Sequence, residues 1–355
     1  MRENENRNKR VSIHDVATRA GVSITTVSRV INNVDYPVSG EVRKRVLDAV
    51  SELNYTPNIS AQHLRRSFNN VIALIVRDVA NSYFGDIAKG VTEKAMELGY
   101  LSFICNTGRD PANELKYHDL LWQHRVRGII LAGGGIRSER HLEVLQRQVE
   151  RGREFGFSIV SLAPQPISIR SVSVDYAQVA EMMTSYLLSK GHRSIGFITG
   201  RADVVTCGNH LEGYQRALAQ AGVAFQENLF VYQDFTEPGG YHGFSTLLSR
   251  KLNVTALCAG SDTIGTGVLQ AAHHKGVRVP RDLSLIGIGD LPQAQYMQPP
   301  LTTVRIPRYE MGARAVELIV GAQDNSKTDL ENEVQDIVFQ PLIVERSSVR
   351  DIGWS

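Results

Sequence analysis

Cysteine is scarce in this sequence, and its spacing excludes the usual cysteine chemistry. The 355 residues include Cys105, Cys207 and Cys258, which form no C-x-x-C pair and no metal-ligand spacing. An odd number of widely spaced cysteines does not build a disulfide framework. We therefore expect three buried free thiols in a protein of the reducing cytoplasm.

Long apolar runs are also missing. No segment approaches the roughly 20 consecutive apolar residues that a membrane-spanning helix needs. Residues 1–10 are rich in asparagine and charge and lack an apolar centre, which does not fit a secretion signal. These absences predict a cytoplasmic protein with a disordered amino-terminal arm and no membrane partner.

The sequence signs of catalysis and of cofactor binding are absent as well. Gly133-Gly-Gly135 lacks the Lys-Ser/Thr of a P-loop and the full dinucleotide spacing, so we interpret it as a turn after a strand. His273 and His274 are adjacent and do not share one helical face as a metal pair would. No Ser–His–acid motif stands out, although a triad assembled in space leaves no sequence motif. We expect no metal, no cofactor and no enzyme.

Charge of the two signs is nearly balanced, with a formal net charge of +2, but it is unevenly spread. Residues 1–70 carry 11 Lys and Arg against 7 Asp and Glu, whereas the rest of the chain carries 28 against 30. Because phosphate attracts cations, a basic amino-terminal segment fits nucleic-acid binding. An excess this small does not establish DNA binding by itself.

What the sequence does contain is a pair of short amphipathic helices joined by a tight turn, within residues 11–33. The first helix has apolar residues at i, i+3, i+4 and i+7 from Ile13, which predicts one buried stripe. Ser12 and Asp15 have the spacing of an acidic capping box at its start. Gly21 allows a sharp turn, because a positive φ costs glycine little.

The second helix presents polar side chains on the face opposite its valines. Arginine can read guanine through two hydrogen bonds, asparagine can read adenine, and a threonine methyl can contact the methyl of thymine. A third helix over residues 42–53 carries cations suited to phosphate. The pattern predicts a helix-turn-helix that enters the major groove. Expected DNA contacts are Ser23, which also caps the second helix, Ile24, Thr25, Thr26, Arg29 and Asn32.

Residues 58–70 form a linker between this headpiece and the rest of the chain. Pro57 and Asn58 make a good helix start, and the segment has room for only a short helix. Such a helix is marginal alone in water, so we expect it to form only when DNA and a partner subunit support it.

From Val71 onward, apolar runs alternate with amphipathic stretches that end on glycine. This alternation predicts parallel sheets covered on both faces, arranged as two subdomains with a cleft between them. Ligands of such sheets bind at the carboxyl ends of the strands. Predicted strands are 71–76, 101–105, 128–132, 159–162, 194–198, 256–259 and 283–288; predicted helices include 87–99, 179–191, 211–222 and 265–276.

Several segments together carry a family resemblance. Over residues 11 to about 346 the chain resembles the lactose-repressor (LacI/GalR) family of bacterial transcription regulators. The early match is specific, and the later segments occur in the family's order. The matching segments are Asp15–Ser23, Thr26–Asn32, Leu53–Asn58, Gly191–Gly196, Arg278–Gly287 and Pro300–Thr303.

The resemblance implies an all-α helix-turn-helix headpiece and an α/β body like a periplasmic binding protein, built of two doubly wound parallel-sheet subdomains. It implies a transcription regulator, which we expect to be a repressor. The partners would be a near-palindromic double-stranded DNA operator, a second copy of the chain and a small-molecule effector. Expected parts are the arm 1–10, headpiece 11–57, hinge 58–70, body 71–346 and tail 347–355, with subdomains at about 71–172 plus 304–336 and about 173–301 plus 337–346.

In the family, the hinge segment folds on the operator, pairs with its twin and inserts a leucine into the minor groove. Leu64 matches that leucine, and Ala61 matches the small residue where the two hinge helices touch. An apolar wedge of this kind kinks DNA. We expect Arg65 to contact DNA beside it, whereas Gln62 replaces a more usual arginine.

For the effector, the resemblance implies a pocket made by loops that follow the strands. His210 stands where most members have an arginine, Ser261 replaces a frequent asparagine, and Gly289 replaces an aspartate that binds sugar hydroxyls. His210 is open to two interpretations, a pH-responsive group or a neutral structural one. The lost polar partners favour a smaller or less polar effector than a hexose, or none. Expected contacts are Asp78, Tyr83, Phe84, Thr206, His210, Phe235, Asp262 and Asp290.

Two alternatives remain at this stage. The body alone would suit a small-molecule receptor of the periplasmic-binding class or, with less support, an enzyme on that scaffold. The helix-turn-helix and the missing signal peptide favour the regulator.

Overall fold

The computed structural model describes residues 11–31, 36–55, 68–321 and 336–353, with the side chain of Arg153 excepted. The chain divides into two units, one that precedes Phe68 and one that begins there. Each unit has its own apolar core.

The amino-terminal unit is a cluster of three helices, α1 (Ile13–Ala20), α2 (Ile24–Ile31) and α3 (Gly40–Glu52). Their apolar faces pack against one another, as the spacing of the valines and alanines predicts. The buried core of the unit consists of Val16, Ala17, Ala20, Val27, Val30, Val46 and Ala49.

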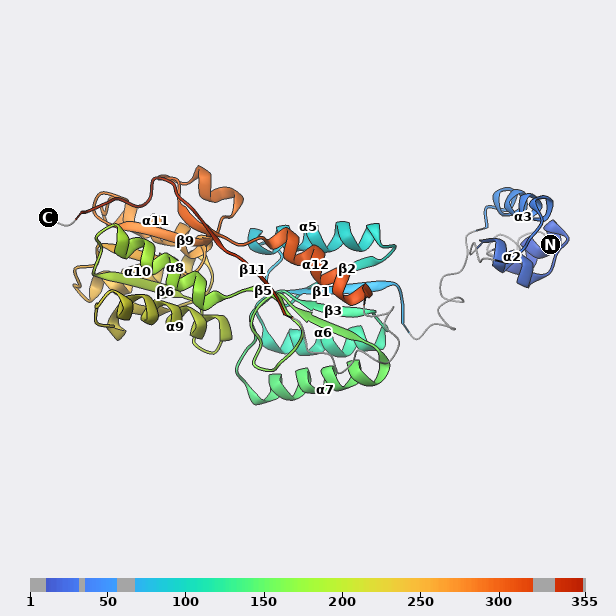
Figure 1. Ribbon diagram of the computed structural model, residues 1–355, viewed down its shortest axis with the longest axis horizontal. Coiled ribbons are helices and arrows are strands. Elements are labelled where there is room, and N and C mark those ends of the chain that lie inside the picture. The colour runs from blue at the N-terminus through green and yellow to red at the C-terminus, as the bar shows by residue number, and fades with distance from the viewer. Residues whose placement is uncertain (1–10, 32–35, 56–67, 322–335, 354–355) are drawn as a thin grey trace, which may run out of the picture. The chain divides into compact units, whose positions relative to one another are not determined.

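The second unit, the body, contains two parallel-stranded lobes (Figure 1). In the first lobe the strand order is β2-β1-β3-β4, and helices cover both faces of the sheet. The strands are β1 (Val71–Val76), β2 (Leu101–Asn106), β3 (Gly128–Leu131) and β4 (Ser158–Ser161). The helices are α5 (Ser82–Glu97) and α12 (Arg308–Gly321) on one face, and α6 (Pro111–Gln123) and α7 (Glu139–Phe155) on the other.

The central strand β1 explains why its sequence is a continuous apolar run. Ile72 and Leu74 belong to the core under α5 and α12, whereas Ala73 and Ile75 belong to the core on the opposite face. Because successive side chains of a strand point to opposite faces, a strand covered on both sides needs apolar residues throughout.

The second lobe contains a sheet of order β12-β10-β9-β8-β6-β7, parallel except for β12. Helices α8 and α9 pack together, as do α10 and α11. The strands are β6 (Ile195–Thr199), β7 (Phe230–Tyr232), β8 (Ala256–Ala259), β9 (Ser284–Gly289), β10 (Thr302–Arg305) and β12 (Leu342–Val344). The helices are α8 (Tyr176–Ser189), α9 (Val205–Gln220), α10 (Glu237–Ser249) and α11 (Asp262–His274).

The chain passes between the lobes more than once. Strand β5 (Val172–Val174) pairs in parallel with β11 (Ile337–Phe339), and Figure 1 shows both between the two lobes. Strand β10 still pairs with β9, so the return into the first lobe, where α12 packs against α5, follows Arg305.

One predicted strand differs from the expected burial. Leu101, Phe103 and Ile104 on β2 are exposed, because β2 is the edge of its sheet and no described element covers its outer side chains. The three cysteines are free and buried, as predicted. Among the described helices, none combines the length and apolar character that crossing a membrane requires.

Candidate DNA interface and ligand cavity

The start of α1 has the capping geometry that the sequence predicts. The Ser12 hydroxyl accepts a hydrogen bond from the Asp15 backbone amide at 3.4 Å, and the Asp15 carboxylate accepts one from the Ser12 amide at 2.8 Å. Gly21 ends the helix at φ +64°, in the left-handed region. This geometry fixes the turn that leads into α2.

The outward face of α2 carries the residues predicted to contact DNA. Ser23, Ile24 and Thr25 are exposed. The Ser23 hydroxyl caps the helix by accepting a hydrogen bond from the Thr26 amide at 3.2 Å, and it lies 2.8 Å from the Thr26 hydroxyl. Ser23 and Thr26 therefore position the first turn, and Ile24 and Thr25 lie free at the surface.

Arg29 is held in place by an aromatic residue that the sequence did not single out. Its guanidinium carbon lies 3.8 Å from the ring centroid of Tyr36. Stacking of this kind restricts the side chain without using its hydrogen-bond donors. Tyr36 is thus part of the candidate interface, and its only sequence signal is an aromatic residue soon after the helix.

Four other predicted DNA contacts, Asn32, Ala61, Leu64 and Arg65, lie outside the described residues. They stay predictions.

The body contains a cavity of about 130 Å³ at the carboxyl ends of strands from both lobes. Loops after β1, β2, β3 and β4 form one side, and loops after β6, β7 and β8 form the other. This is the position that parallel α/β sheets predict for a ligand. Five residues predicted as effector contacts line it: Tyr83, Phe84, Thr206, His210 and Phe235.

His210 is a neutral group in this cavity wall. Its Nδ1 lies 2.8 Å from the Thr199 hydroxyl, whereas its buried Nε2 has no hydrogen-bond partner among the described residues. Burial lowers the pKa of His210 to about 3. The hydroxyl of Thr206, one helical turn earlier on α9, is likewise buried without a partner. Both atoms therefore have unused hydrogen-bonding capacity within the described protein.

Two arginines at the carboxyl ends of adjacent strands also line the cavity. Arg77 follows β1 and donates a hydrogen bond to the Gly134 carbonyl; Arg109 follows β2 and pairs with Asp78 at 3.3 Å. Sequence reasoning missed both as site residues. Their signal was available, because Arg77 directly follows one predicted strand and Arg109 follows the next predicted strand within a few residues.

Three carboxylates that the sequence predicts as effector contacts do not line the cavity. Asp78 instead pairs with Arg109 and accepts a hydrogen bond from the Ala80 amide at 3.1 Å. Its side chain therefore orients an arginine of the cavity rather than facing the cavity itself.

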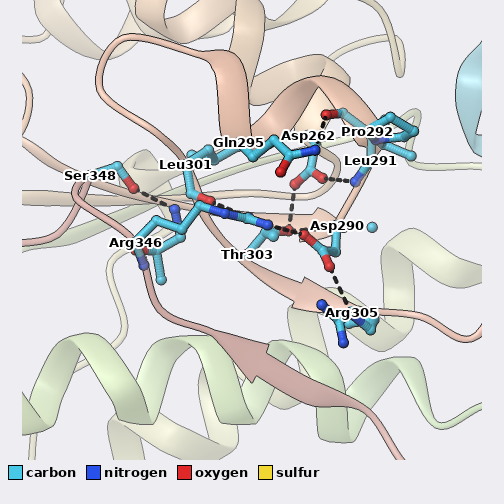
Figure 2. Close-up of polar contacts among 12 residues, drawn as sticks. Asp262, Asp290, Leu291, Pro292, Gln295, Leu301, Thr303, Arg305, Arg346 and Ser348 are labelled. Carbon is cyan, nitrogen blue, oxygen red and sulfur yellow. Dashed lines mark hydrogen bonds and ion pairs between the residues drawn. The ribbon is translucent and has the colours of Figure 1, made fainter.

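Asp262 and Asp290 are held by groups of their own lobe (Figure 2). Asp262 accepts hydrogen bonds from the Thr303 hydroxyl at 2.5 Å and the Leu291 amide at 2.7 Å, and burial raises its pKa to about 6. Asp290 pairs with Arg305 and Arg346 at 2.7 and 2.6 Å. The structure thus gives both aspartates a role in joining β9, β10 and the carboxyl-terminal segment.

The glycines after β3 admit close contacts, at Gly134 with the other lobe and at Gly133 with Arg77 of the same lobe. A Cβ added at Gly134 would lie 2.3 Å from the Thr206 hydroxyl oxygen, and one at Gly133 would lie 2.5 Å from Arg77 Nε. The interpretation of this segment as a turn is therefore incomplete, because the missing side chains also make room for residues of the cavity.

Within the described residues, no group of three His, Cys, Asp or Glu side chains is arranged to hold a metal ion. A helix-turn-helix unit joined to a two-lobed body with a cavity at the ends of both sheets defines a class. That class is the DNA-binding regulator with a ligand-binding body.

Comparison with known proteins agrees with this class. Residues 12–58 match the model of bacterial regulatory proteins of the lacI family, and residues 184–349 match that of a periplasmic binding protein-like domain. The chain is 36% identical to the HTH-type transcriptional regulator DegA of Bacillus subtilis over 97% of this chain and 99% of that protein. It is 32% identical to the HTH-type transcriptional repressor PurR of Edwardsiella ictaluri, over 96% and 97%.

A solved structure shows the same architecture. The complex of the transcriptional regulator CelR with cellobiose has a TM-score of 0.70 at 30% identity, and the match covers 96% of this chain and 100% of that one. The chain therefore belongs to the LacI family of bacterial transcription regulators. The resemblance and fold class predicted from the sequence are confirmed.

Proposed function

We propose that this protein is a cytoplasmic repressor that binds a near-palindromic operator as a homodimer and responds to a small-molecule effector in the body. The observation that carries the proposal is the coexistence, in one chain, of an exposed recognition face on α2 and a cavity with buried unpartnered polar atoms. It acts by binding rather than by catalysis, and it needs no cofactor.

The DNA side of the proposal rests on α2. Arg29, supported by Tyr36, would read a guanine, while Thr25 and Ile24 supply apolar contacts to base methyl groups. Exposed Lys44 and Arg45 of α3 suit phosphate contacts, which set orientation rather than sequence preference.

The remaining DNA contacts lie outside the described residues; that of Asn32 follows from the pattern of the second helix, and those of the hinge follow the family resemblance. We propose that Asn32 reads base edges at the end of α2. In the hinge, Leu64 enters the minor groove at the centre of the operator, Ala61 allows the two hinge helices to touch, and Arg65 contacts the backbone.

The dimer has a candidate surface in the first lobe. Met96 and Leu98 near the end of α5, and Leu101 and Phe103 on edge strand β2, are all large apolar side chains exposed to solvent. A second copy of the chain would cover them and the open edge of the sheet. Two-fold symmetry of the protein would match the two half-sites of a palindrome.

The effector would act through the two lobes that form its cavity. Backbone groups already join the lobes at its rim, where Ile136 bridges Val204 and the Gly135 carbonyl accepts a hydrogen bond from the Val205 amide at 2.9 Å. An effector that binds one arrangement of the lobes more tightly shifts the population toward it, and operator affinity follows.

Selection of bound sequences from a random DNA pool, with purified full-length protein, tests the proposal. We expect enrichment of one site with two-fold symmetry. Adding an extract of small cellular metabolites should change the fraction of that site that stays bound to the protein. Failure to enrich any site under either condition would contradict DNA regulation, and enrichment of an asymmetric site would contradict the symmetric dimer.

A further inference from the structure

Cationic side chains outnumber carboxylates among the described residues that line the cavity. Arg77, Arg109 and Arg201 line it, whereas Asp234 is the one carboxylate among the described lining residues. The side-chain oxygen of Asn81 is already used, since it accepts a hydrogen bond at 2.9 Å from an amide in the first turn of α5. The lining side chains therefore carry more positive than negative charge, while Asp203 pairs with Arg201 and Asp78 pairs with Arg109 from outside the lining.

Two of these arginines converge. The Arg109 amide donates to the Arg77 carbonyl at 2.8 Å, which ties together the loops that follow β1 and β2. Arg109 has φ +65°, a conformation that side-chain-bearing residues rarely adopt and that concentrates at binding sites. Burial lowers the pKa of Arg77; the nearby Glu114 carboxylate raises it, and the positive charge of Arg109 lowers it. The charge of Arg109 therefore acts on Arg77, and an anion bound beside both arginines would favour the charged form of each.

The cavity is small and much of its wall is aromatic. Its volume of about 130 Å³ is close to that of engineered protein cavities that hold benzene. Tyr83, Phe84, Tyr176 and Phe235 contribute ring surfaces, with Tyr83 and Phe84 packed edge to face at 5.3 Å between centroids. This space suits a single planar ring.

Two buried polar atoms in the cavity wall have no hydrogen-bond partner among the described residues. The Thr206 hydroxyl and His210 Nε2 are on one face of α9, separated by one helical turn, and neither has a hydrogen-bond partner in the described protein. Because unpaired buried polar groups are costly, a ligand that hydrogen-bonds to them gains affinity. A hydroxyl on the ring would serve both, since it donates and accepts.

We propose that the effector is a monocyclic oxyanion, a planar ring that carries a carboxylate or phosphate group and a hydroxyl. The anionic group binds between Arg77 and Arg109, the ring packs on the aromatic wall, and the hydroxyl meets Thr206 and His210. This inference rests on the proposed function, because it names the effector of the same cavity.

A neutral sugar fits this lining poorly. Sugar hydroxyls require acceptors as well as donors. Among the described residues the lining offers one carboxylate, that of Asp234, because those of Asp78, Asp262 and Asp290 are occupied by other protein groups.

Isothermal titration of the full-length protein with matched probes tests the inference. The probes are para-hydroxybenzoate, phenyl phosphate, the neutral analogue para-hydroxybenzyl alcohol, inorganic phosphate and glucose. We expect at least one ring-bearing anion to bind roughly ten- to a hundredfold more tightly than the neutral alcohol. Binding of the alcohol or of glucose as tightly as the tighter-binding of the two ring-bearing anions, or no binding of either ring-bearing anion, would overturn the inference. If inorganic phosphate bound as tightly as phenyl phosphate, the result would contradict a contribution of the ring to binding.

Two variants test the named contacts. Arg109→Gln should abolish the preference for the anion over the alcohol, whereas Arg278→Gln should retain it, because Arg278 pairs with Asp282 at 2.8 Å outside the cavity. Thr206→Val should lower the affinity for para-hydroxybenzoate but not that for benzoate. An unchanged preference in the Arg109 variant, with an unaltered thermal midpoint, would contradict the anion site.

Operator binding measured on the same preparations separates the two proposals. Specific operator binding without any preference for the anions would overturn the effector chemistry and leave the regulator in place. Tight anion binding without any sequence-specific DNA binding would overturn the proposed function and retain the chemistry of the cavity.

Discussion

Replacing Arg29 by alanine should weaken specific operator binding and spare non-specific binding. A bidentate contact between arginine and guanine is worth about 1–3 kcal/mol per copy. A dimer with two half-sites would lose about 2–6 kcal/mol, since the two copies are far apart and their losses add. A tenfold change in affinity corresponds to roughly 1.4 kcal/mol, so the operator dissociation constant would rise between about thirtyfold and about twenty-thousandfold.

Fluorescence anisotropy with the selected operator and with a scrambled duplex, at one fixed salt concentration, measures both affinities. Tyr36→Leu serves as a graded companion, because it removes the stack at 3.8 Å but leaves the guanidinium in place. It should cost less than the loss of Arg29. Arg45→Ala, on the exposed side of α3, should weaken binding to the operator and to the scrambled duplex by the same factor. An equal loss on both duplexes in the Arg29 variant would refute base reading by this residue.

Four further outcomes are expected. Gly134→Ala should hinder the approach of the two lobes, because the added Cβ would lie 2.3 Å from Thr206 Oγ1. The affinity for the effector, measured by titration, should fall at least about tenfold, and an unchanged affinity would contradict the close approach. Leu64→Ala should reduce operator bending in a gel-mobility assay while the headpiece stays folded, and undiminished bending would contradict the wedge. Phe103→Asp, on exposed β2, should shift sedimentation from dimer toward monomer by at least tenfold in dissociation constant, about 1.4 kcal/mol or more; an intact dimer would exclude this surface. Burial lowers the pKa of His210 from 6.5 to about 3, so its contribution to stability is complete above pH 6.5 and is lost as the pH falls from 6.5 toward 3. At pH 5 this protonation linkage should lower the free energy of unfolding by about 2 kcal/mol. The free energy of unfolding of His210→Gln, measured in urea at several pH values, should fall by that much less toward pH 5.

Local features of the fold were predictable because their causes lie within a few residues. Ser12 and Asp15 satisfy the first amides of α1, and Gly21 ends it, without help from the rest of the chain. The body strands were predictable for a related reason, since burial on both faces leaves a continuous apolar run such as Val71–Val76.

The orientation of individual site residues was less predictable, because it depends on partners far along the chain. Asp262 stands after a strand, as an effector contact should, but Thr303 and the Leu291 amide draw its carboxylate away from the cavity. Arg29 was predicted to face outward, and its partner Tyr36 lies soon after α2, but no sequence pattern predicts that this ring stacks on the guanidinium.

Edge strand β2 illustrates a different limit. Its apolar residues Leu101 and Phe103 indicated burial, yet both are exposed in the single chain. The apolar sequence of a strand indicates that its side chains need to be buried, but it does not indicate which element buries them. For β2 we propose that a second copy of the chain does so.

The symmetry and stoichiometry of the DNA complex test the central claim most directly. Native mass spectrometry of the full-length protein on the selected operator should show two chains per duplex, and a duplex that keeps only one half-site should bind far more weakly. One chain per duplex, or equal affinity for the half-site, would contradict an operator read by two copies of α2 in a symmetric dimer.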